Sequence, residues 1–331
     1  MKGQYAGHLP GNDPMFAYLR HEIFPQLGSD CSEGIRVFQT NGSNAVYIYE
    51  DRKSCQCVVG KFFYSERNTD WELAQRRLDR EYNNIKAFSS YLGENHYVAK
   101  ILGRNDVLNC LLVVEYCTGT PLDRIILESI NTGNPGLLRE KLTALADFLA
   151  TVHNRSAREE KVDFNETCRY YENIVGDLKH LLSDGDTAWF HQLKERWRND
   201  PVMWEDNQVL VHGDATPSNF FFGDGMYVIS FDMERVRIAD RCFDVGRIAG
   251  ELHHFFMRTV KDRYAAEEFV GHFLWEYACR FPDRDAAFNA ITRRIPFYMG
   301  TTLLRIARNT YLEDDYRHAL IGAGENCLRK A

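Results

Sequence analysis

The 331-residue sequence lacks any long hydrophobic run and any excess of positive charge. No stretch approaches the roughly 20 consecutive apolar residues that cross a bilayer, and residues 1–8 lack the apolar segment of a secretory signal. The net charge of −7 argues against a nucleic-acid-binding surface. These absences predict a cytoplasmic protein with no membrane partner and no nucleic-acid partner.

The sequence also lacks the regular cysteine spacing of a disulfide framework, and it contains no internal repeat. The nine cysteines are an odd number spread from Cys31 to Cys327, so reduced thiols are expected rather than a disulfide framework. Cys55 and Cys57 form the one close pair, and no second Cys or His pair stands at zinc-site spacing. With 44% hydrophobic and 13% aromatic residues, the chain is sufficient for one large or two medium globular domains.

The chemically informative segment lies at the ends of two apolar runs. The run at 209–211 leads into a His-x-Asp turn at 212–214, and Asn219 follows five residues after that aspartate. A second run, at 228–231, ends at Asp232. Phosphoryl transfer requires a carboxylate that orients and deprotonates the attacking hydroxyl, and oxygen ligands for magnesium. The spacing therefore indicates a phosphoryl-transfer site; the alternative is a polar hairpin whose side chains satisfy turn backbone.

At these residues the chain resembles the kinase superfamily that includes aminoglycoside phosphotransferases, choline kinases and related small-molecule kinases. The resemblance implies that Asp214 is the catalytic base, that Asn219 and Asp232 are magnesium ligands, and that His212 steadies the loop. It also implies an α+β, bilobal protein-kinase-like fold. Residues 1–118 would form a nucleotide-binding lobe with an antiparallel β-sheet and one main helix. Residues 119–331 would form a mostly helical lobe with the catalytic loop and the acceptor site.

The hydrophobic pattern of the first hundred or so residues predicts a short helix and then mainly strands. The helix has one apolar face and stops at Gly28; the face consists of Phe16, Leu19, Ile23 and Phe24. Five apolar runs predict a five-stranded sheet, at 35–38, 45–49, 57–64, 97–102 and 110–116. A longer helix is predicted from about Asp70 to Leu92. Beyond residue 121 the chain is expected to be mainly helical, with helices that include 138–152, 168–183 and 186–199.

Glu81 lies beside the apolar stripe of the predicted helix at 70–92. A carboxylate directed toward a core needs a partner, and Lys61 in the third strand is the obvious candidate. The resembling family pairs such a strand lysine with a helix glutamate, and that lysine touches the nucleotide phosphates. The alternative is that both side chains are solvated.

Two further segments are implied to contact the nucleotide. The turn at 40–45 has one glycine in place of the Gly-x-Gly-x-x-Gly of protein kinases; its Gly42 and Ser43 would donate to phosphate oxygens, and a plain hairpin is the alternative. The last strand run ends at Glu115, Tyr116 and Cys117, where the family's backbone receives the adenine edge. The Gly and Pro residues that follow indicate an interlobe linker.

Departures from protein kinases indicate the acceptor class. Thr216 stands where a protein kinase has a lysine, no Phe-Gly pair follows Asp232, and no Ala-Pro-Glu segment is found. A peptide-binding platform is therefore not expected. Asp244 is expected to anchor the catalytic loop or to cap a helix. The acidic run at 313–315 fits either an acceptor pocket or an exposed helix start.

The predicted reaction is magnesium-dependent transfer of the γ-phosphate of ATP to a hydroxyl of a small polar molecule. A sugar, an aminoglycoside and an amino alcohol all remain open as acceptors, and GTP remains open as the donor. Two hypotheses from other classes accompany this prediction. One is a catalytically silent, nucleotide-binding regulatory protein of the same fold; the other is a transferase that moves a nucleotidyl group or modifies a protein.

Overall fold

The computed structural model describes residues 3–40, 45–66, 68–262 and 264–330, which form two compact units. The N-terminal unit comprises the chain up to Ser90, Val98–Thr118 and the short returning segment Phe231–Glu234. The C-terminal unit comprises the remaining segments, which are Tyr91–Tyr97, Gly119–Ser230 and the chain from Arg235 onward. Neither unit is therefore continuous in sequence.

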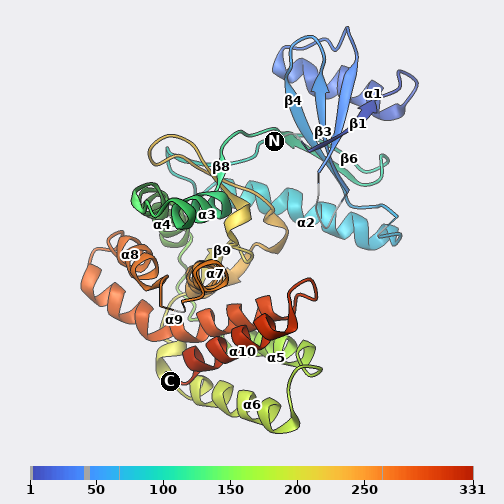
Figure 1. Cartoon of the computed structure of the whole chain (residues 1–331). Coiled ribbons are helices and arrows are strands. Elements are labelled where there is room, and N and C mark those ends of the chain that lie inside the picture. The colour runs from blue at the N-terminus through green and yellow to red at the C-terminus, as the bar shows by residue number, and fades with distance from the viewer. Residues whose placement is uncertain (1–2, 41–44, 67, 263, 331) are drawn as a thin grey trace. The chain divides into compact units, whose positions relative to one another are not determined.

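The N-terminal unit is built on a six-stranded antiparallel sheet (Figure 1). Neighbouring strands follow the order β1-β2-β3-β4-β7-β6. Their bounds are β1 (Gln4–His8), β2 (Ile35–Gln39), β3 (Ala45–Asp51), β4 (Cys57–Phe62), β6 (Ile101–Asn105) and β7 (Leu111–Glu115). The predicted sheet lacked β1. The side chains of this edge strand are mostly exposed, so it has no apolar pattern, and it is held by main-chain pairing with β2.

One predicted strand was wrong in extent. The apolar run at 97–102 divides between β5 (His96–Val98) and β6, with two residues outside both strands. The strand β5 belongs to a second sheet, whose order is β5-β11-β10-β8. The apolar run thus marks the passage of the chain from one sheet to another, which periodicity alone does not reveal.

Two helical segments accompany the six-stranded sheet. The first begins with α1 (Pro14–Tyr18), continues through two shorter turns, and ends at Gly28, whose φ of +74° suits a residue without a Cβ. The second is α2 (Trp71–Ser89), which begins after Asp70, whose side chain accepts a hydrogen bond from the amide of Leu73. Both confirm the helices predicted in this part of the chain.

The C-terminal unit is mostly helical. Its helices are α3 (Leu122–Thr132), α4 (Gly136–Arg155), α5 (Phe164–Asp177), α6 (Asp184–Arg198), α7 (Cys242–Val260), α8 (Glu267–Ala278), α9 (Arg284–Ala307) and α10 (Asp314–Leu328). Its short strands are β8 (Thr120–Pro121), β9 (Val209–Val211), β10 (Phe220–Phe222), β11 (Val228–Ser230) and β12 (Arg237–Ala239). The long helix α9 packs against both α7 and α10 (Figure 1).

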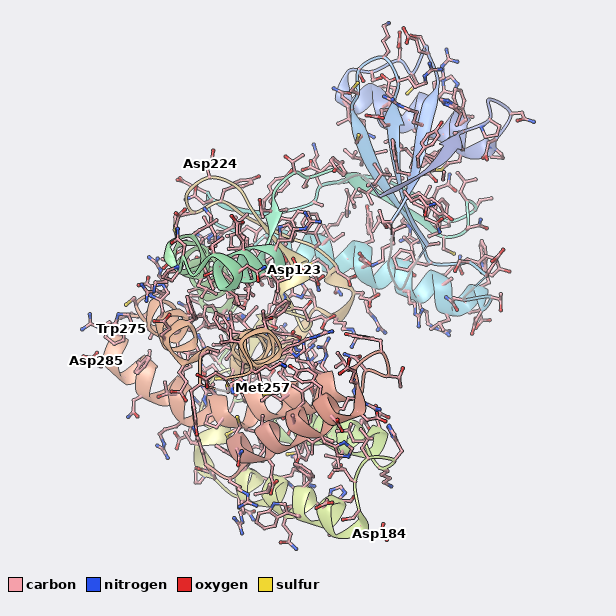
Figure 2. The ribbon with its side chains drawn as sticks, in the orientation of Figure 1. Asp123, Asp184, Asp224, Met257, Trp275 and Asp285 are labelled. Carbon is pink, nitrogen blue, oxygen red and sulfur yellow. The ribbon has the colours of Figure 1, made fainter. Side chains whose placement is uncertain are left out.

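Acidic residues stand at several helix starts of the C-terminal unit. Asp123, Asp184 and Asp285 lie in the first turns of α3, α6 and α9 (Figure 2). Carboxylates there interact favourably with the positive end of the helix dipole. The acidic run at 313–315 is a helix start of the same kind, because Glu313 is the N-cap of α10 and two aspartates follow it.

All nine cysteines are free thiols, as predicted. Burial raises the pKa of Cys31 to about 11, and it has the same effect on Cys168 and Cys327, so these thiols stay protonated at neutral pH. Within the described ranges, no helix combines the length and the apolar composition needed to cross a membrane.

A fully buried polar cluster joins three helices of the C-terminal unit. His153 of α4 lies between Tyr277 of α8 and Asp244 of α7. The Tyr277 hydroxyl donates to His153 Nδ1 at 2.7 Å, and His153 Nε2 donates to Asp244 Oδ2 at 3.3 Å. Both ring nitrogens are thus satisfied by the neutral imidazole, and burial lowers the pKa of His153.

This cluster predicts a loss of stability in mild acid. Because the pKa of His153 is lower in the folded protein, the unfolded chain takes up the proton first as the pH falls below about 6.5, and folding is opposed. His153→Gln should reduce the loss of unfolding free energy between about pH 7.5 and pH 5.5 by about 1 kcal/mol. Urea unfolding at the two pH values measures this loss. His318→Gln, at an exposed position of α10, is the control; an equal pH slope in all three proteins would contradict the assignment.

Candidate active site

Strand β4 directs Lys61 toward helix α2. Side chains alternate along a strand, and Val58 and Phe62 pack with the α1 segment on one face of the sheet. Lys61 therefore projects from the other face, where its Nζ lies 2.6 Å from Glu81 Oε2. The predicted ion pair is present, and both side chains are largely buried. The solvated alternative is wrong for this pair.

Lys61 binds more than one carboxylate. Its Nζ also lies 2.8 Å from Asp232 Oδ1 and 3.9 Å from Glu234 Oε2, both on the returning segment of the N-terminal unit. Sequence analysis identified Asp232 but gave Glu234 no role. Oxygen atoms of Glu81, Asp232 and Glu234 all lie within 4.8 Å of one another. The N-terminal unit therefore gathers three carboxylates around one ammonium.

The returning segment is fixed by its backbone. Asn84 of α2 donates a hydrogen bond through Nδ2 to the Met233 carbonyl at 2.7 Å. Asp232 has a φ of +59°, in the left-handed region that aspartate adopts more readily than most residues. Backbone strain of this kind occurs preferentially at functional sites. Here it accompanies the contact between the Asp232 carboxylate and Lys61.

The charges of this cluster suit a divalent cation. Burial alone would lower the pKa of Lys61, but Glu81 and Asp232 raise it, so the ammonium stays charged. Burial raises the pKa of Glu81 to about 7, against the opposing effect of Lys61. One ammonium offsets one of the three carboxylates, and oxygen ligands of this type are those that magnesium prefers. The donor set therefore fits magnesium.

The other nucleotide contacts predicted for this unit remain predictions. Gly42 and Ser43 lie outside the described residues. Glu115 ends β7, and Tyr116 and Cys117 follow it as partly buried residues. The Cys117 thiol donates to Glu115 Oε1 at 3.3 Å.

In the C-terminal unit, Asp244 fixes the turn that follows β9. Its Oδ2 accepts a hydrogen bond from the His212 amide at 2.6 Å, and its Oδ1 accepts one from the Gly213 amide at 2.9 Å. Asp244 lies in the first turn of α7 and is fully buried. The prediction that Asp244 anchors this turn through backbone hydrogen bonds is confirmed. The ring of His212 accepts a hydrogen bond from the Asp214 amide at 3.2 Å, which is a structural role.

The same turn ties Asn219 to Asp214. Asn219 Nδ2 donates to the Asp214 carbonyl at 2.9 Å, and the Thr216 amide donates to this carbonyl at 2.7 Å. The side-chain oxygen of Asn219 is not used in that bond. The segment Pro217–Asn219 forms one helical turn before β10. The predicted residues Asp214 and Asn219 are thus brought together within the C-terminal unit.

Arginines surround the Asp214 carboxylate. Arg247 Nη1 donates to Oδ1 at 2.6 Å, Arg305 Nη2 donates to the same oxygen at 3.0 Å, and Arg235 Nε lies 4.0 Å from Oδ2. Burial alone would raise the pKa of Asp214, but Arg247, Arg305 and Arg235 together lower it. Asp214 is therefore ionised at neutral pH.

Sequence reasoning missed these arginines as site residues. Arg235 and Arg247 stand in a stretch of mixed charge after Asp232, where no spacing rule separates them from solvated residues. Arg305 lies near the end of α9, far along the chain from Asp214. Only the packing of α7 against α9 brings it to the loop.

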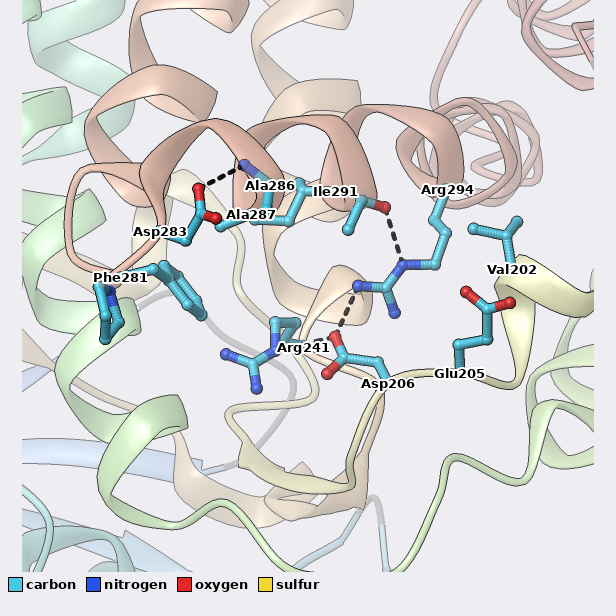
Figure 3. A pocket seen from close by; sticks show the side chains of 12 residues that line it. Val202, Glu205, Asp206, Arg241, Phe281, Asp283, Ala286, Ala287, Ile291 and Arg294 are labelled. Carbon is cyan, nitrogen blue, oxygen red and sulfur yellow. Dashed lines mark hydrogen bonds and ion pairs between the residues drawn. The ribbon is translucent and has the colours of Figure 1, made fainter.

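A separate cavity of about 490 Å³ lies in the C-terminal unit (Figure 3). It contains none of the predicted site residues. Two arginines in its wall are paired with Asp206: Arg241 Nε donates to Asp206 Oδ2 at 3.0 Å and Arg294 Nη2 donates to it at 2.6 Å. Both arginines of this wall are therefore paired with a carboxylate of the same wall.

Gly213 cannot be replaced without moving the turn. Its φ is +77°, and a Cβ at this position would lie 2.1 Å from the carbonyl oxygen of Arg235. Gly213→Ala should therefore destabilise the protein by about 1–3 kcal/mol in urea unfolding, because the loop from His212 to Asp214 must shift. Gly271→Ala, in α8 with open space at the new methyl, is the control. Equal stabilities of the two variants would contradict this account.

Comparison with solved structures identifies the fold. The ethanolamine kinase of Plasmodium vivax has a TM-score of 0.59 at 16% identity, with 95% of this chain and 86% of that chain covered. The choline kinase of Cryptosporidium parvum Iowa II has a TM-score of 0.61 at 12% identity, with 96% and 94% covered. The amicoumacin kinase hAmiN has a TM-score of 0.57 at 15% identity, with 95% and 92% covered. At these identities the likeness establishes the predicted protein-kinase-like fold.

Sequence comparison identifies the family. None of the curated proteins compared matches the chain. The family model described as "Phosphotransferase enzyme family" matches residues 36–281, well over half of the chain. This range includes Lys61 and Glu81 as well as the turn that carries Asp214. The chain therefore belongs to the phosphotransferase enzyme family.

Proposed function

We propose that this phosphotransferase is a small-molecule kinase, which moves the γ-phosphate of ATP to a hydroxyl of a small polar molecule in the presence of magnesium. The observation that carries the proposal is the ionised carboxylate of Asp214 on a turn fixed by Asp244. The hydrogen bonds from Arg247 and Arg305 both fall on Oδ1, and Oδ2 lies 4.0 Å from Arg235 Nε. We assign Oδ2 to the acceptor hydroxyl.

Asp214 positions the hydroxyl and takes its proton. A new bond forms between the hydroxyl oxygen and the γ-phosphorus as the bond from that phosphorus to the ADP oxygen breaks. Because the three arginines lower the pKa of Asp214, this carboxylate is a weak base, and its main contribution is orientation. That suits a loose phosphoryl transfer, in which positioning and charge stabilisation supply most of the rate.

The N-terminal unit supplies the groups for the nucleotide. Lys61, held by Glu81, contacts the phosphates, and the backbone of Glu115, Tyr116 and Cys117 receives the adenine edge. Asp232 and Glu234 would hold magnesium on this unit. The family resemblance gives Asn219 of the C-terminal unit the role of a further metal ligand. When bound, magnesium would neutralise charge on the phosphates.

Structures of related fold support the choice of cofactors and acceptor. The amicoumacin kinase was solved with AMP-PNP, a calcium ion and Ami, its small-molecule ligand. The ethanolamine and choline kinases are named for small alcohols. These relatives support a nucleotide, a divalent cation and a small hydroxylated acceptor for this chain. The range of acceptors stays that of the sequence analysis: a sugar, an aminoglycoside or an amino alcohol.

Substitution of Asp214 tests the proposed reaction. Asp214→Ala and the shape-matched Asp214→Asn should each lower turnover at least about 100-fold, because proton transfer and orientation are lost. Nucleotide affinity should change by less than about threefold, since the nucleotide groups lie on the other unit. The measurement is transfer of label from γ-labelled ATP to pools of sugars, aminoglycosides, amino alcohols and nucleosides.

The control for this experiment is Asp184→Asn, which alters an exposed first-turn carboxylate of α6. Unchanged turnover in the Asp214 variants would remove the assignment. Nucleotide binding without transfer to any acceptor or to water would instead favour the silent regulatory protein. Product mass separates phosphate transfer from nucleotidyl transfer.

Lys61→Met tests the proposed phosphate contact. Loss of the ammonium leaves Glu81, Asp232 and Glu234 without their common cation, and kcat/KM for magnesium-ATP should fall on the order of 100-fold. Lys53→Met is the matched control, because Lys53 forms an exposed ion pair with Asp30 in the same unit. Equal kinetics of the two variants would rule out a phosphate contact by Lys61.

A further inference from the structure

Guanidinium groups crowd the acceptor side of Asp214. Arg247 and Arg305 bind Oδ1, and Arg235 lies beside Oδ2. Nitrogen atoms of three guanidinium groups therefore lie within 4.0 Å of the oxygens of this one carboxylate.

These arginines differ in their access to a ligand. The side chain of Arg247 is only 2% exposed, and its Nη2 donates to the Tyr170 hydroxyl at 2.8 Å, so it is a positioning residue for Asp214. The side chain of Arg305 is 19% exposed, and that of Arg235 is 53% exposed. Arg305 and Arg235 are therefore the cations that a bound acceptor can reach.

Carboxylates near Asp214 are already bonded. Glu251 Oε1 accepts a hydrogen bond from Arg305 Nη1 at 3.2 Å. Asp244 is occupied by the amides of the turn and by His153. Among these described neighbours, an acceptor with an ammonium group would meet carboxylates that already hold arginines or amides. It would also meet the repulsion of the arginines themselves.

The arginines at Asp214 also repel one another. Burial lowers the pKa of Arg305, and the neighbouring Arg247 lowers it further. In the cavity of Figure 3, by contrast, Arg294 binds both Asp206 and Asp240. An anionic ligand beside Arg305 would relieve the repulsion, and no such relief is needed in that cavity.

We propose that the hydroxyl acceptor carries an anionic group, either a carboxylate or a phosphate, which Arg235 and Arg305 bind while Asp214 faces the hydroxyl. This inference rests on the proposed kinase function. The planar guanidinium matches both anions because it donates two parallel hydrogen bonds. The inference narrows the acceptor range from polar hydroxylated molecules in general to hydroxy acids and phosphorylated alcohols or sugars.

A different role for these arginines makes a different prediction. Thr216 stands where a protein kinase has a lysine, and Arg235 or Arg305 in its place would stabilise the transferring phosphate. In that role, loss of the arginine lowers kcat by the same factor for every acceptor. An arginine that binds the acceptor anion raises KM for anionic acceptors more than for neutral ones.

Matched acceptors that differ only in charge test the proposal. One set is glycerate, glycerol 3-phosphate, glycerol and 3-aminopropane-1,2-diol; the other is glucuronate, glucose 6-phosphate, glucose and glucosamine. Binding is measured by ligand-observed NMR on the full chain saturated with magnesium and a non-hydrolysable ATP analogue, so that the nucleotide occupies its own phosphate contacts. In each set an anionic member should bind at least about tenfold more tightly than the neutral one, and the amine most weakly.

Two variants assign the preference to its residue. Arg235→Ala should reduce the ratio of anionic to neutral affinity by about tenfold, and Arg235→Glu should reverse the order of anion and amine. The exposed position of Arg235 makes these variants compatible with folding. Arg139→Ala, which removes an exposed arginine paired with Glu268, is the control and should retain the wild-type order.

The outcomes separate this inference from the proposed function. Neutral or amine members that bind as tightly as the anions would overturn the inference, as would an anion preference that Arg235→Ala leaves intact. An equal fall of kcat for all acceptors would assign the arginine to the transferring phosphate and also overturn it. Anion preference without transfer from γ-labelled ATP to any acceptor or to water would sustain the anion site and refute the kinase.

Discussion

The hydrogen bonds of the Asp244 carboxylate are the constraint on which the C-terminal unit depends. This buried carboxylate accepts hydrogen bonds from the amides of His212 and Gly213 and from the ring of His153. A buried charge is costly unless it is fully hydrogen-bonded, and each of these partners removes part of that cost. The same bonds set the direction of the turn, and the turn sets the direction of Asp214. Both the stability of this region and the orientation of Asp214 therefore depend on one side chain.

The two units use opposite electrostatic arrangements. The N-terminal unit places three carboxylates around the ammonium of Lys61, so that the cluster can accept a cation. The C-terminal unit places guanidinium groups around the carboxylate of Asp214, so that the cluster can accept an anion. These arrangements match the two substrates that we propose, a metal-bound nucleotide and an acceptor with its own negative charge.

Local sequence patterns predicted most of the fold and part of the candidate site. Helices and central strands were predictable from periodicity. The ion pair of Lys61 and Glu81 was also predictable, because the glutamate lies at the edge of the apolar stripe of α2 and the lysine lies in a neighbouring strand. The strand β1 was not predictable, because its pairing with β2 is main-chain bonding with little side-chain burial. Arg305 was not predictable either, since helix packing rather than sequence spacing delivers it to Asp214.

The returning segment Phe231–Glu234 bears on how the protein matures during synthesis. Domains of many proteins fold in order as the chain leaves the ribosome. Here the N-terminal unit lacks Asp232 and Glu234 until residue 234 has emerged, long after β7 is complete. Until then Lys61 has Glu81 alone as its partner among these carboxylates. Completion of the N-terminal unit thus requires translation of much of the C-terminal unit, so the nascent chain does not finish the two units in order.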